Sequence, residues 1–267
     1  MSAAVDGRLA LEARLRRALD NEEFVLHYQP KVNLASSRLT GAEALIRWND
    51  PHAGLTAPGR FIPMLEETGL IQDVGRWAMR QSIADHLRWR SNGLAAVRIA
   101  VNVSALQLRD RSFIAEVRHA IGADARSAAG LELEITESVV MQDVTHSVGI
   151  LQAIRAMGVS IAIDDFGTGF SSLNYLSRLP LDTLKIDQSF VADMCGKPRG
   201  LALVSAIIGL AAALKFSVVA EGVETEEQSR QLLLLHCDEM QGSLIGMPVP
   251  SDVFEARFLA AEESPAA

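Results

Sequence analysis

The sequence predicts an α/β protein, specifically a modified (β/α)8 TIM-like barrel with one antiparallel strand near the N-terminus. Two observations lead to this prediction. Eight short runs rich in Val, Ile and Leu recur along the 267 residues, and segments with helical spacing follow most of them. This alternation is typical of βα units in a parallel sheet. A closed eight-stranded barrel of this kind takes about 250 residues.

Each of the eight runs predicts one strand of the barrel. In chain order they are FVLHYQPKV near Phe24, AEALIRW near Glu43, VRIAVNVS from Val97, LELEITE from Leu131, SIAIDDFG from Ser160, TLKIDQSF from Thr183, SVVAEGVE from Ser217 and EMQGSLI from Glu239. Between the first two lies VNLASSRLTG, which is short, polar and turn-like. We therefore expect a hairpin at this point, with one of its strands antiparallel to the rest.

One domain is predicted over residues 11–258, between a frayed N-terminal segment or linker (1–10) and a frayed C-terminal tail (259–267). Thr145 is a candidate N-cap for a helix that ends before Gly158, and Thr225 opens a helix with a partial capping box. Residues 201–214 are strongly apolar but shorter than the roughly 20 residues that cross a bilayer. They predict a buried helix, and no membrane span is expected.

Composition excludes several classes of protein. Hydrophobic residues make up 49% and charged residues 22%, as in an ordinary folded globule. The 25 basic and 33 acidic residues give a net charge of −8, which argues against a DNA-binding surface. Cys195 and Cys237 form no metal or disulfide motif, and no signal peptide is recognisable. A reducing, cytoplasmic location is expected.

Polar side chains stand near the C-terminal ends of most predicted strands. Strands buried on both faces are normally apolar, so a carboxylate or amide there is costly unless it is paired or binds a metal. In a barrel these strand ends converge on one mouth, where active sites are built. The set consists of Glu43, Asn102, Glu134, Asp164, Asp165, Lys185, Glu221 and Gln241.

This set predicts a metal site, because oxygen ligands without His or Cys select Mg²⁺, Mn²⁺ or Ca²⁺. Two such ions about 3.5–4 Å apart are usual for displacement at phosphorus. A kink near Gly167 and Gly169 is expected to turn Asp164 and Asp165 toward one metal pair. Lys185 either holds a water or phosphate oxygen, or forms a salt bridge inside the barrel. Separately, Arg98 and Glu132 are expected to form an interior ion pair.

The ordered motifs resemble those of the EAL-domain cyclic di-GMP phosphodiesterases. The resemblance covers about Leu11 to Pro250. The matching motifs are GAEALIRW around Glu43, VNVS at 101–104, ELEITE at 132–137, DDFGTGFSSLNYL at 164–176, LKID at 184–187, AEGVE at 220–224 and QG at 241–242.

The resemblance implies hydrolysis of cyclic di-GMP to linear pGpG with Mg²⁺ or Mn²⁺, two ions per site. It implies one ion on Glu43, Asn102, Glu134 and Asp164, and a second on Asp164, Asp165 and Glu221. The implied catalytic residues are Lys185, which orients the water, Glu221 as general base, Asp165, and Glu137 as anchor of the loop after Asp164. The implied substrate contacts are Gln29, Leu45, Arg47, Asn102, Asp187, Glu224 and Gln241.

Two alternatives to the enzyme remain open, a non-catalytic cyclic di-GMP receptor and an unrelated metal-dependent barrel enzyme. This chain departs from the family at Ser243, Ile245 and Met247, where weaker guanine stacking or phosphate attraction is expected. The resemblance also implies a homodimer whose contact lies near residues 171–182, with Leu173, Tyr175, Leu176 and Leu179. Attachment to sensory or GGDEF domains in a longer chain is a further expectation from the family.

Overall fold

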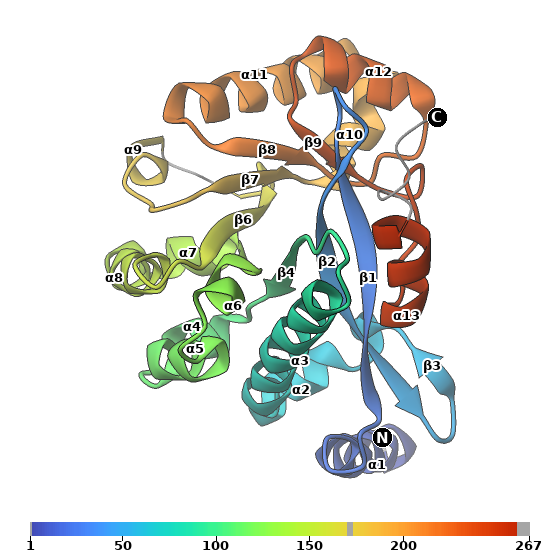
Figure 1. Ribbon diagram of the computed structural model, residues 1–267. Coiled ribbons are helices and arrows are strands. Elements are labelled where there is room, and N and C mark those ends of the chain that lie inside the picture. The colour runs from blue at the N-terminus through green and yellow to red at the C-terminus, as the bar shows by residue number, and fades with distance from the viewer. Residues whose placement is uncertain (1, 170–172, 261–267) are drawn as a thin grey trace.

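Eight strands close a barrel in the computed structural model, which describes residues 2–169 and 173–260 (Figure 1). β1 pairs with both β2 and β9, and this closes the ring. Around the barrel the strands are β1 (Phe24–Asn33), β9 (Glu239–Gln241), β8 (Ser217–Ala220), β7 (Thr183–Ile186), β6 (Ser160–Phe166), β5 (Leu131–Thr136), β4 (Arg98–Asn102) and β2 (Leu39–Asp50).

The predicted antiparallel strand is β1. It runs antiparallel to β2 and β9, whereas the other barrel strands pair in parallel. The modified TIM-like barrel is thereby confirmed. Two short strands, β3 (Gly54–Thr56) and β10 (Val249–Pro250), extend the sheet beyond the ring and were not predicted.

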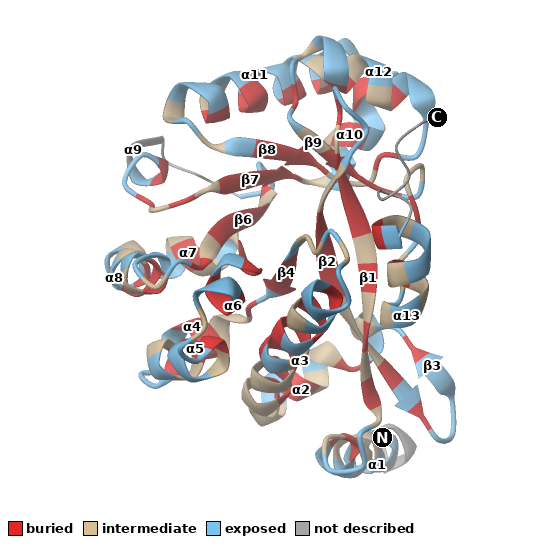
Figure 2. Cartoon of the chain, in the orientation of Figure 1, coloured by how far each residue is buried: buried red, intermediate tan, exposed pale blue. Residues whose placement is uncertain are grey.

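Helices surround the barrel, with their buried faces toward the strands (Figures 1 and 2). They are α1 (Ser2–Ala18), the short η1 (Pro58–Arg60), α2 (Ile62–Thr68), α3 (Ile71–Ser91), α4 (Ala105–Arg109), α5 (Phe113–Ile121), α6 (Ala125–Ala129), α7 (Glu137–Gln142), α8 (Val144–Arg155), α9 (Leu173–Leu176), α10 (Gln188–Met194), α11 (Pro198–Leu214), α12 (Glu226–Leu234), α13 (Ser251–Phe254) and the final turn η2 (Glu255–Leu259). Among the described residues, no helix combines the length and apolarity needed to span a membrane.

Helical structure extends into both terminal segments, over residues 2–10 and at Leu259. The helix α1 begins at Ser2, and in its second half Leu11, Leu15 and Ala18 recur at helical spacing and pack against a cluster that includes Phe61. At the other end, Leu259 is buried in the main core. The remainder of the predicted tail, from residue 261 onward, lies outside the described residues.

Three helix predictions also need correction. The cap of α8 is Asp143, two residues before the predicted Thr145, and its side chain accepts a hydrogen bond from the His146 N–H at 3.0 Å. The capping box of α12 is complete, because Gln228 at the N3 position bonds back to Thr225. Only one face of α11 is buried, and Leu203 on that helix is 41% exposed.

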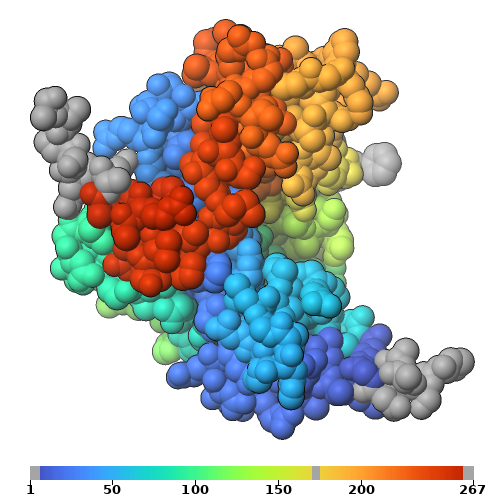
Figure 3. Space-filling model, turned by 90° about the vertical axis from the view of Figure 1, so that its right-hand side faces the viewer, coloured from blue at the N-terminus to red at the C-terminus, as the bar shows by residue number. Residues whose placement is uncertain are grey.

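The C-terminal segment packs on the end of α3. Arg88 donates a hydrogen bond to Ser251 and forms an ion pair with Glu255, while the Trp89 indole N–H donates to Glu255. In the side view of Figure 3, this segment (red) lies beside the blue-green part of the chain. Phe254 of the same segment packs against Tyr28 of β1, so residues far away in the sequence cover this side of the barrel.

Candidate active site

Lys185 is the centre of an acidic cluster at the carboxyl ends of the barrel strands. The side chain comes from β7 and is completely buried. Its Nζ lies 2.7 Å from Glu134 Oε2 and 2.7 Å from Glu221 Oε1, 3.3 Å from Asp164 Oδ1 and 3.5 Å from Glu43 Oε2. The strand-end residues that the sequence singled out therefore meet. Four carboxylates share one ammonium group.

Amide side chains hold Glu43 in place. Asn102 Nδ2 donates to Glu43 Oε1 at 2.8 Å, and Gln241 Nε2 donates to Glu43 Oε2 at 2.7 Å. Gln241 Nε2 also donates to Gln29 Oε1 at 3.0 Å, and Gln29 Nε2 donates to the Gly246 carbonyl at 3.1 Å. Because Nδ2 of Asn102 is used in this way, its Oδ1 is the atom left to ligate a cation.

The predicted kink in β6 lies at Asp165 itself. This residue has φ +53°, and the pairing of β6 with β7 is irregular between Ile163 and Phe166. As a result, oxygens of Asp164, Asp165 and Glu221 lie within 4.8 Å of one another. The sequence indicates conformational freedom only at the glycines. Gly167 does have φ +97°, but the first residue of this segment with a positive φ is Asp165, directly after Asp164.

Gly169 has a different role, because the absence of a side chain there leaves space for the carboxylate of Glu137. A Cβ at Gly169 would lie 2.5 Å from Glu137 Oε1. The other oxygen of Glu137 accepts a hydrogen bond from the Gly167 N–H at 2.9 Å, while Oε1 is buried without a hydrogen-bond partner among the described residues. Glu137, at the start of α7, thus contacts the segment that follows Asp164.

The cluster contains more negative charge than Lys185 neutralises. Burial, together with Glu43 and Asp164, raises the pKa of Glu134 to about 8. Burial and the same two carboxylates raise the pKa of Glu221 to about 7. Lys185 shows the complementary effect: burial opposes its charge, yet the carboxylates hold its pKa well above the usual range.

These residues fit a divalent cation. The donors are carboxylate and amide oxygens, which Mg²⁺ and Mn²⁺ prefer. Asp164, Asp165 and Glu221 provide one group of ligand oxygens. The pKa of Asp165 is raised by burial and by the neighbouring Asp164 and Asp187. A cation relieves this repulsion, because it supplies the positive charge that the cluster lacks.

A cleft of 270 Å³ opens beside the cluster. Of the predicted site residues, six line this cleft: Gln29, Glu43, Leu45, Glu221, Glu224 and Gln241. Asn102 and Leu45 line a second cavity of 380 Å³ that continues between β2, β4 and α2.

Two predicted substrate contacts line neither cavity. Arg47 is half-buried and donates to the Ile46 carbonyl at 2.9 Å. Asp187 caps α10 by accepting a hydrogen bond from the Ser189 N–H at 3.1 Å. Of the three positions that depart from the family, Ser243 lines the cleft, Ile245 packs against the core and Met247 is 64% exposed.

Lys31 was missed by the sequence analysis. It is buried and contacts Glu132 at 2.8 Å and Glu134 at 3.5 Å. The available signal was its position two residues after Gln29, on the same face of β1. The predicted ion pair of Arg98 and Glu132 is present, but it is not an interior pair. The Arg98 side chain is 45% exposed and lies 3.8 Å from Glu132, whose main partner is Lys31.

The segment expected to form a dimer contact is only partly available. Leu176 and Leu179 are buried within the chain's own core, whereas Tyr175 is 42% exposed. Residues 171 and 172 and the Leu173 side chain lie outside what the structure describes.

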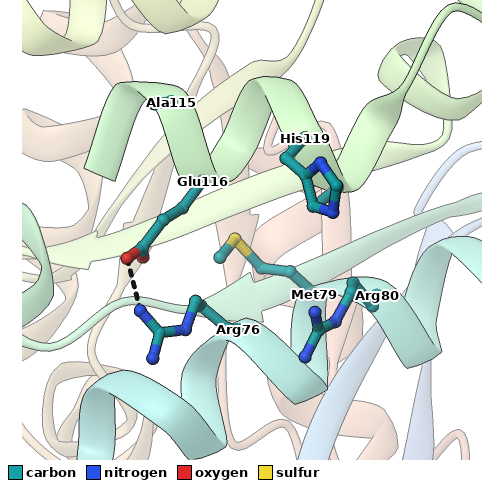
Figure 4. Close-up of a pocket in the computed structure, with 7 residues that line it drawn as sticks. Arg76, Met79, Arg80, Ala115, Glu116 and His119 are labelled. Carbon is teal, nitrogen blue, oxygen red and sulfur yellow. Dashed lines mark hydrogen bonds and ion pairs between the residues drawn. The ribbon is translucent and has the colours of Figure 1, made fainter. Parts of the chain in front are cut away.

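Another hollow lies outside the barrel, between α3 and α5 (Figure 4). Arg76, Arg80, Glu116 and His119 lie along it, and Arg76 is bound to Glu116 across it. None of the predicted site residues lines this hollow. It is therefore separate from the acidic cluster.

The fold and the cluster together define a TIM-like barrel protein with an oxygen-rich acidic site at its mouth. Residues 12–248 match the sequence model of the EAL domain, and the chain belongs to the EAL domain family. The family resemblance of the motifs is thus confirmed.

The relatives are larger signalling proteins. The bifunctional diguanylate cyclase/cyclic di-GMP phosphodiesterase MucR of Pseudomonas aeruginosa is 44% identical over 252 residues, which are 94% of this chain and 37% of MucR. The cyclic di-GMP phosphodiesterase NbdA of the same species is 42% identical over 92% of this chain and 32% of its own. This chain therefore spans about a third of the length of these curated relatives.

Solved structures agree with the fold. The PaMucR phosphodiesterase in complex with c-di-GMP has a TM-score of 0.88 and 44% identity, covering 92% of this chain and 99% of that one. The EAL domain of Mycobacterium smegmatis DcpA has a TM-score of 0.75 and 37% identity, and the match covers 91% of this chain and 100% of that one.

Proposed function

We propose that this chain hydrolyses one phosphodiester bond of cyclic di-GMP and releases linear pGpG, with two Mg²⁺ or Mn²⁺ ions in the site. The observation that carries the proposal is the group of four carboxylates around the buried Lys185 at the barrel mouth. A site built only to bind a dinucleotide has no need of so much buried negative charge. The relatives named as cyclic di-GMP phosphodiesterases support the choice of substrate.

The ligand sets follow the cluster. Glu43, Asn102, Glu134 and Asp164 are proposed for one ion, and Asp164, Asp165 and Glu221 for the other. When bound, the ions neutralise the phosphate and lower the pKa of a bound water. The hydrogen bonds that the side-chain amides of Asn102 and Gln241 donate keep the Glu43 carboxylate in one orientation before any ion binds.

The other roles are assigned by position. Lys185 is proposed to orient the attacking water. Its ammonium lies within 3.5 Å of four proposed metal ligands, namely Glu43, Glu134, Asp164 and Glu221. Glu221 lines the cleft and is the proposed acceptor of the water's proton. Glu137 is proposed to anchor the loop after Asp164, through its bond to the Gly167 N–H.

Substrate contacts are proposed from the cleft outward. Gln29, Leu45, Glu224 and Gln241 line the cavity beside the cluster. Asn102 faces the adjoining cavity. Arg47 and Asp187 line neither cavity, and their substrate contacts are proposed from the family resemblance alone. A homodimer with Tyr175 at its contact, and a cytoplasmic location, complete the proposal.

The test uses purified protein, cyclic di-GMP and Mn²⁺ or Mg²⁺, with products separated by chromatography. We expect pGpG to appear only with the ions, to stop with EDTA, and to be abolished by Glu43→Gln. Glu226→Gln is the matched control, since Glu226 is exposed at the start of α12 and outside the site. Binding of intact cyclic di-GMP without any product would establish the receptor function instead.

A further inference from the structure

A second lysine, Lys31, lies deeper inside the barrel than the acidic cluster. It comes from the antiparallel strand β1, and only 4% of it is exposed. Its Nζ donates to Glu132 Oε1 at 2.8 Å and to Glu134 Oε1 at 3.5 Å. Since Glu132 precedes Glu134 by two residues on β5, Lys31 connects a deeper carboxylate to one of the carboxylates at the mouth.

Glu134 is therefore held by a different lysine on each oxygen. Lys185 donates to Oε2 at 2.7 Å, and Lys31 reaches Oε1 at 3.5 Å. Glu134 is 1% exposed. The Lys185 contact is short and the Lys31 contact is at the long limit of hydrogen bonding, and the two together favour one orientation of this buried carboxylate.

The neighbouring strand leaves space for the Lys31 side chain. Gly41 of β2 is the direct partner of Lys31 in the antiparallel pair. A Cβ at Gly41 would lie 2.9 Å from Lys31 Cε, too close unless the lysine moves. A glycine within a strand usually weakens it, and one use of such a glycine is the close approach of another group. Gly41 and Lys31 are thus complementary in shape.

We propose that Lys31 is a positioning residue for Glu134, holding its Oε1 so that the carboxylate is oriented to ligate a divalent ion. The inference rests on the proposed function and deepens it. Lys31 acts through Glu134 and is not assigned any contact with substrate. The competing explanation is that Lys31 only neutralises Glu132, whose other oxygen already accepts a hydrogen bond from the Thr183 hydroxyl at 3.2 Å.

Two variants separate these explanations: Glu132→Gln alone, and Lys31→Met together with Glu132→Gln. Both lack the deeper carboxylate charge, so neither contains an unpaired Glu132, and they differ only at Lys31. Methionine keeps the length of the lysine stem without its donor. The measurements are thermal unfolding without divalent ions, Mn²⁺ affinity by calorimetry, and kcat and KM for cyclic di-GMP.

We expect Glu132→Gln to keep the wild-type affinity for Mn²⁺. The double variant should unfold at a similar temperature to Glu132→Gln, yet bind Mn²⁺ about 10- to 100-fold more weakly. Its kcat should fall while KM for cyclic di-GMP changes little, because the proposed role of Glu134 is to ligate the ion and not to contact a guanine base.

The outcomes are distinguishable from failure of the proposed function. If the wild-type protein hydrolyses cyclic di-GMP and the double variant matches Glu132→Gln in Mn²⁺ affinity and kcat, the positioning role is overturned while the function stands. If the wild-type protein neither binds Mn²⁺ nor hydrolyses cyclic di-GMP, the proposed function fails, and the inference fails with it.

Discussion

The two lysines buried in this barrel have different electrostatic surroundings. Lys185, at the mouth, has four carboxylates within 3.5 Å. Lys31, in the deeper layer, has Glu132 at 2.8 Å and shares Glu134 at 3.5 Å. The deeper layer is close to neutral, whereas the mouth is strongly negative. In a low-dielectric interior such an excess is relieved either by proton uptake, which the raised pKa values of Glu134 and Glu221 favour, or by a bound cation.

This difference in charge suggests that the deeper layer stabilises the fold, whereas the mouth serves the reaction. A balanced buried pair is satisfied by its own hydrogen bonds, and the Thr183 hydroxyl completes those of Glu132. The mouth is not satisfied internally: burial and neighbouring carboxylates raise the pKa of Glu134 to about 8. Substitutions at the mouth should therefore have the largest effect on activity. In the deeper layer, substitutions at positions other than Lys31 should change only the stability.

Lys185→Met should produce the largest effect. Without the ammonium, Glu43, Glu134, Asp164 and Glu221 surround an uncharged thioether, and hydrolysis should fall about 10²- to 10³-fold. In the absence of divalent ions, the free energy of unfolding should also fall by about 3–5 kcal/mol, because removing one partner leaves buried charges uncompensated. Steady-state kinetics and denaturant unfolding measure the two effects.

The control for this variant is Lys197→Met, since Lys197 is exposed and pairs only with Asp193 among the described residues. It should leave both hydrolysis and unfolding unchanged. If Lys185→Met kept more than about a tenth of the activity, the loss would be smaller than expected for a residue that positions the attacking water, and the contrast between the two lysines would be wrong.

Much of the mouth was predictable from the sequence. Polar residues at the ends of apolar strands are costly, so Glu43, Glu134, Asp164 and Glu221 stood out, and barrel geometry required them to meet. The antiparallel first strand was also predictable, because the polar segment between the first two runs is too short for a crossover helix.

The deeper layer was not predictable in the same way. Whether Lys31 points inward depends on the register of the β1–β2 hairpin, which the sequence does not specify beyond alternation. Arg98 had the expected phase on β4, yet it begins that strand and its side chain is 45% exposed. The kink at Asp165 likewise depends on the loop that follows it, since non-glycine residues rarely adopt a positive φ.

Thr183→Val tests the deeper layer with a smaller effect. The substitution keeps the shape of the side chain and removes the hydroxyl that donates to Glu132 Oε2 at 3.2 Å. A hydrogen bond to a charged group typically contributes about 1.5–3 kcal/mol, so the free energy of unfolding should fall by about that amount. Lys31 still holds Glu134, so kcat and Mn²⁺ affinity should not change. A marked loss of kcat at unchanged stability would show that the layers are not separable.

Arg98→Gln should produce the smallest effect. Its Nη1 lies 3.8 Å from Glu132 Oε2 and its side chain is 45% exposed, so the attraction is weakened by solvent. Ion pairs of this kind usually contribute less than about 1 kcal/mol. Chemical denaturation should therefore detect little change, and hydrolysis should stay at the wild-type rate. A loss of stability as large as that of Thr183→Val would mean that Glu132 depends on Arg98 for its charge balance, and that the deeper layer is not neutralised by Lys31 alone.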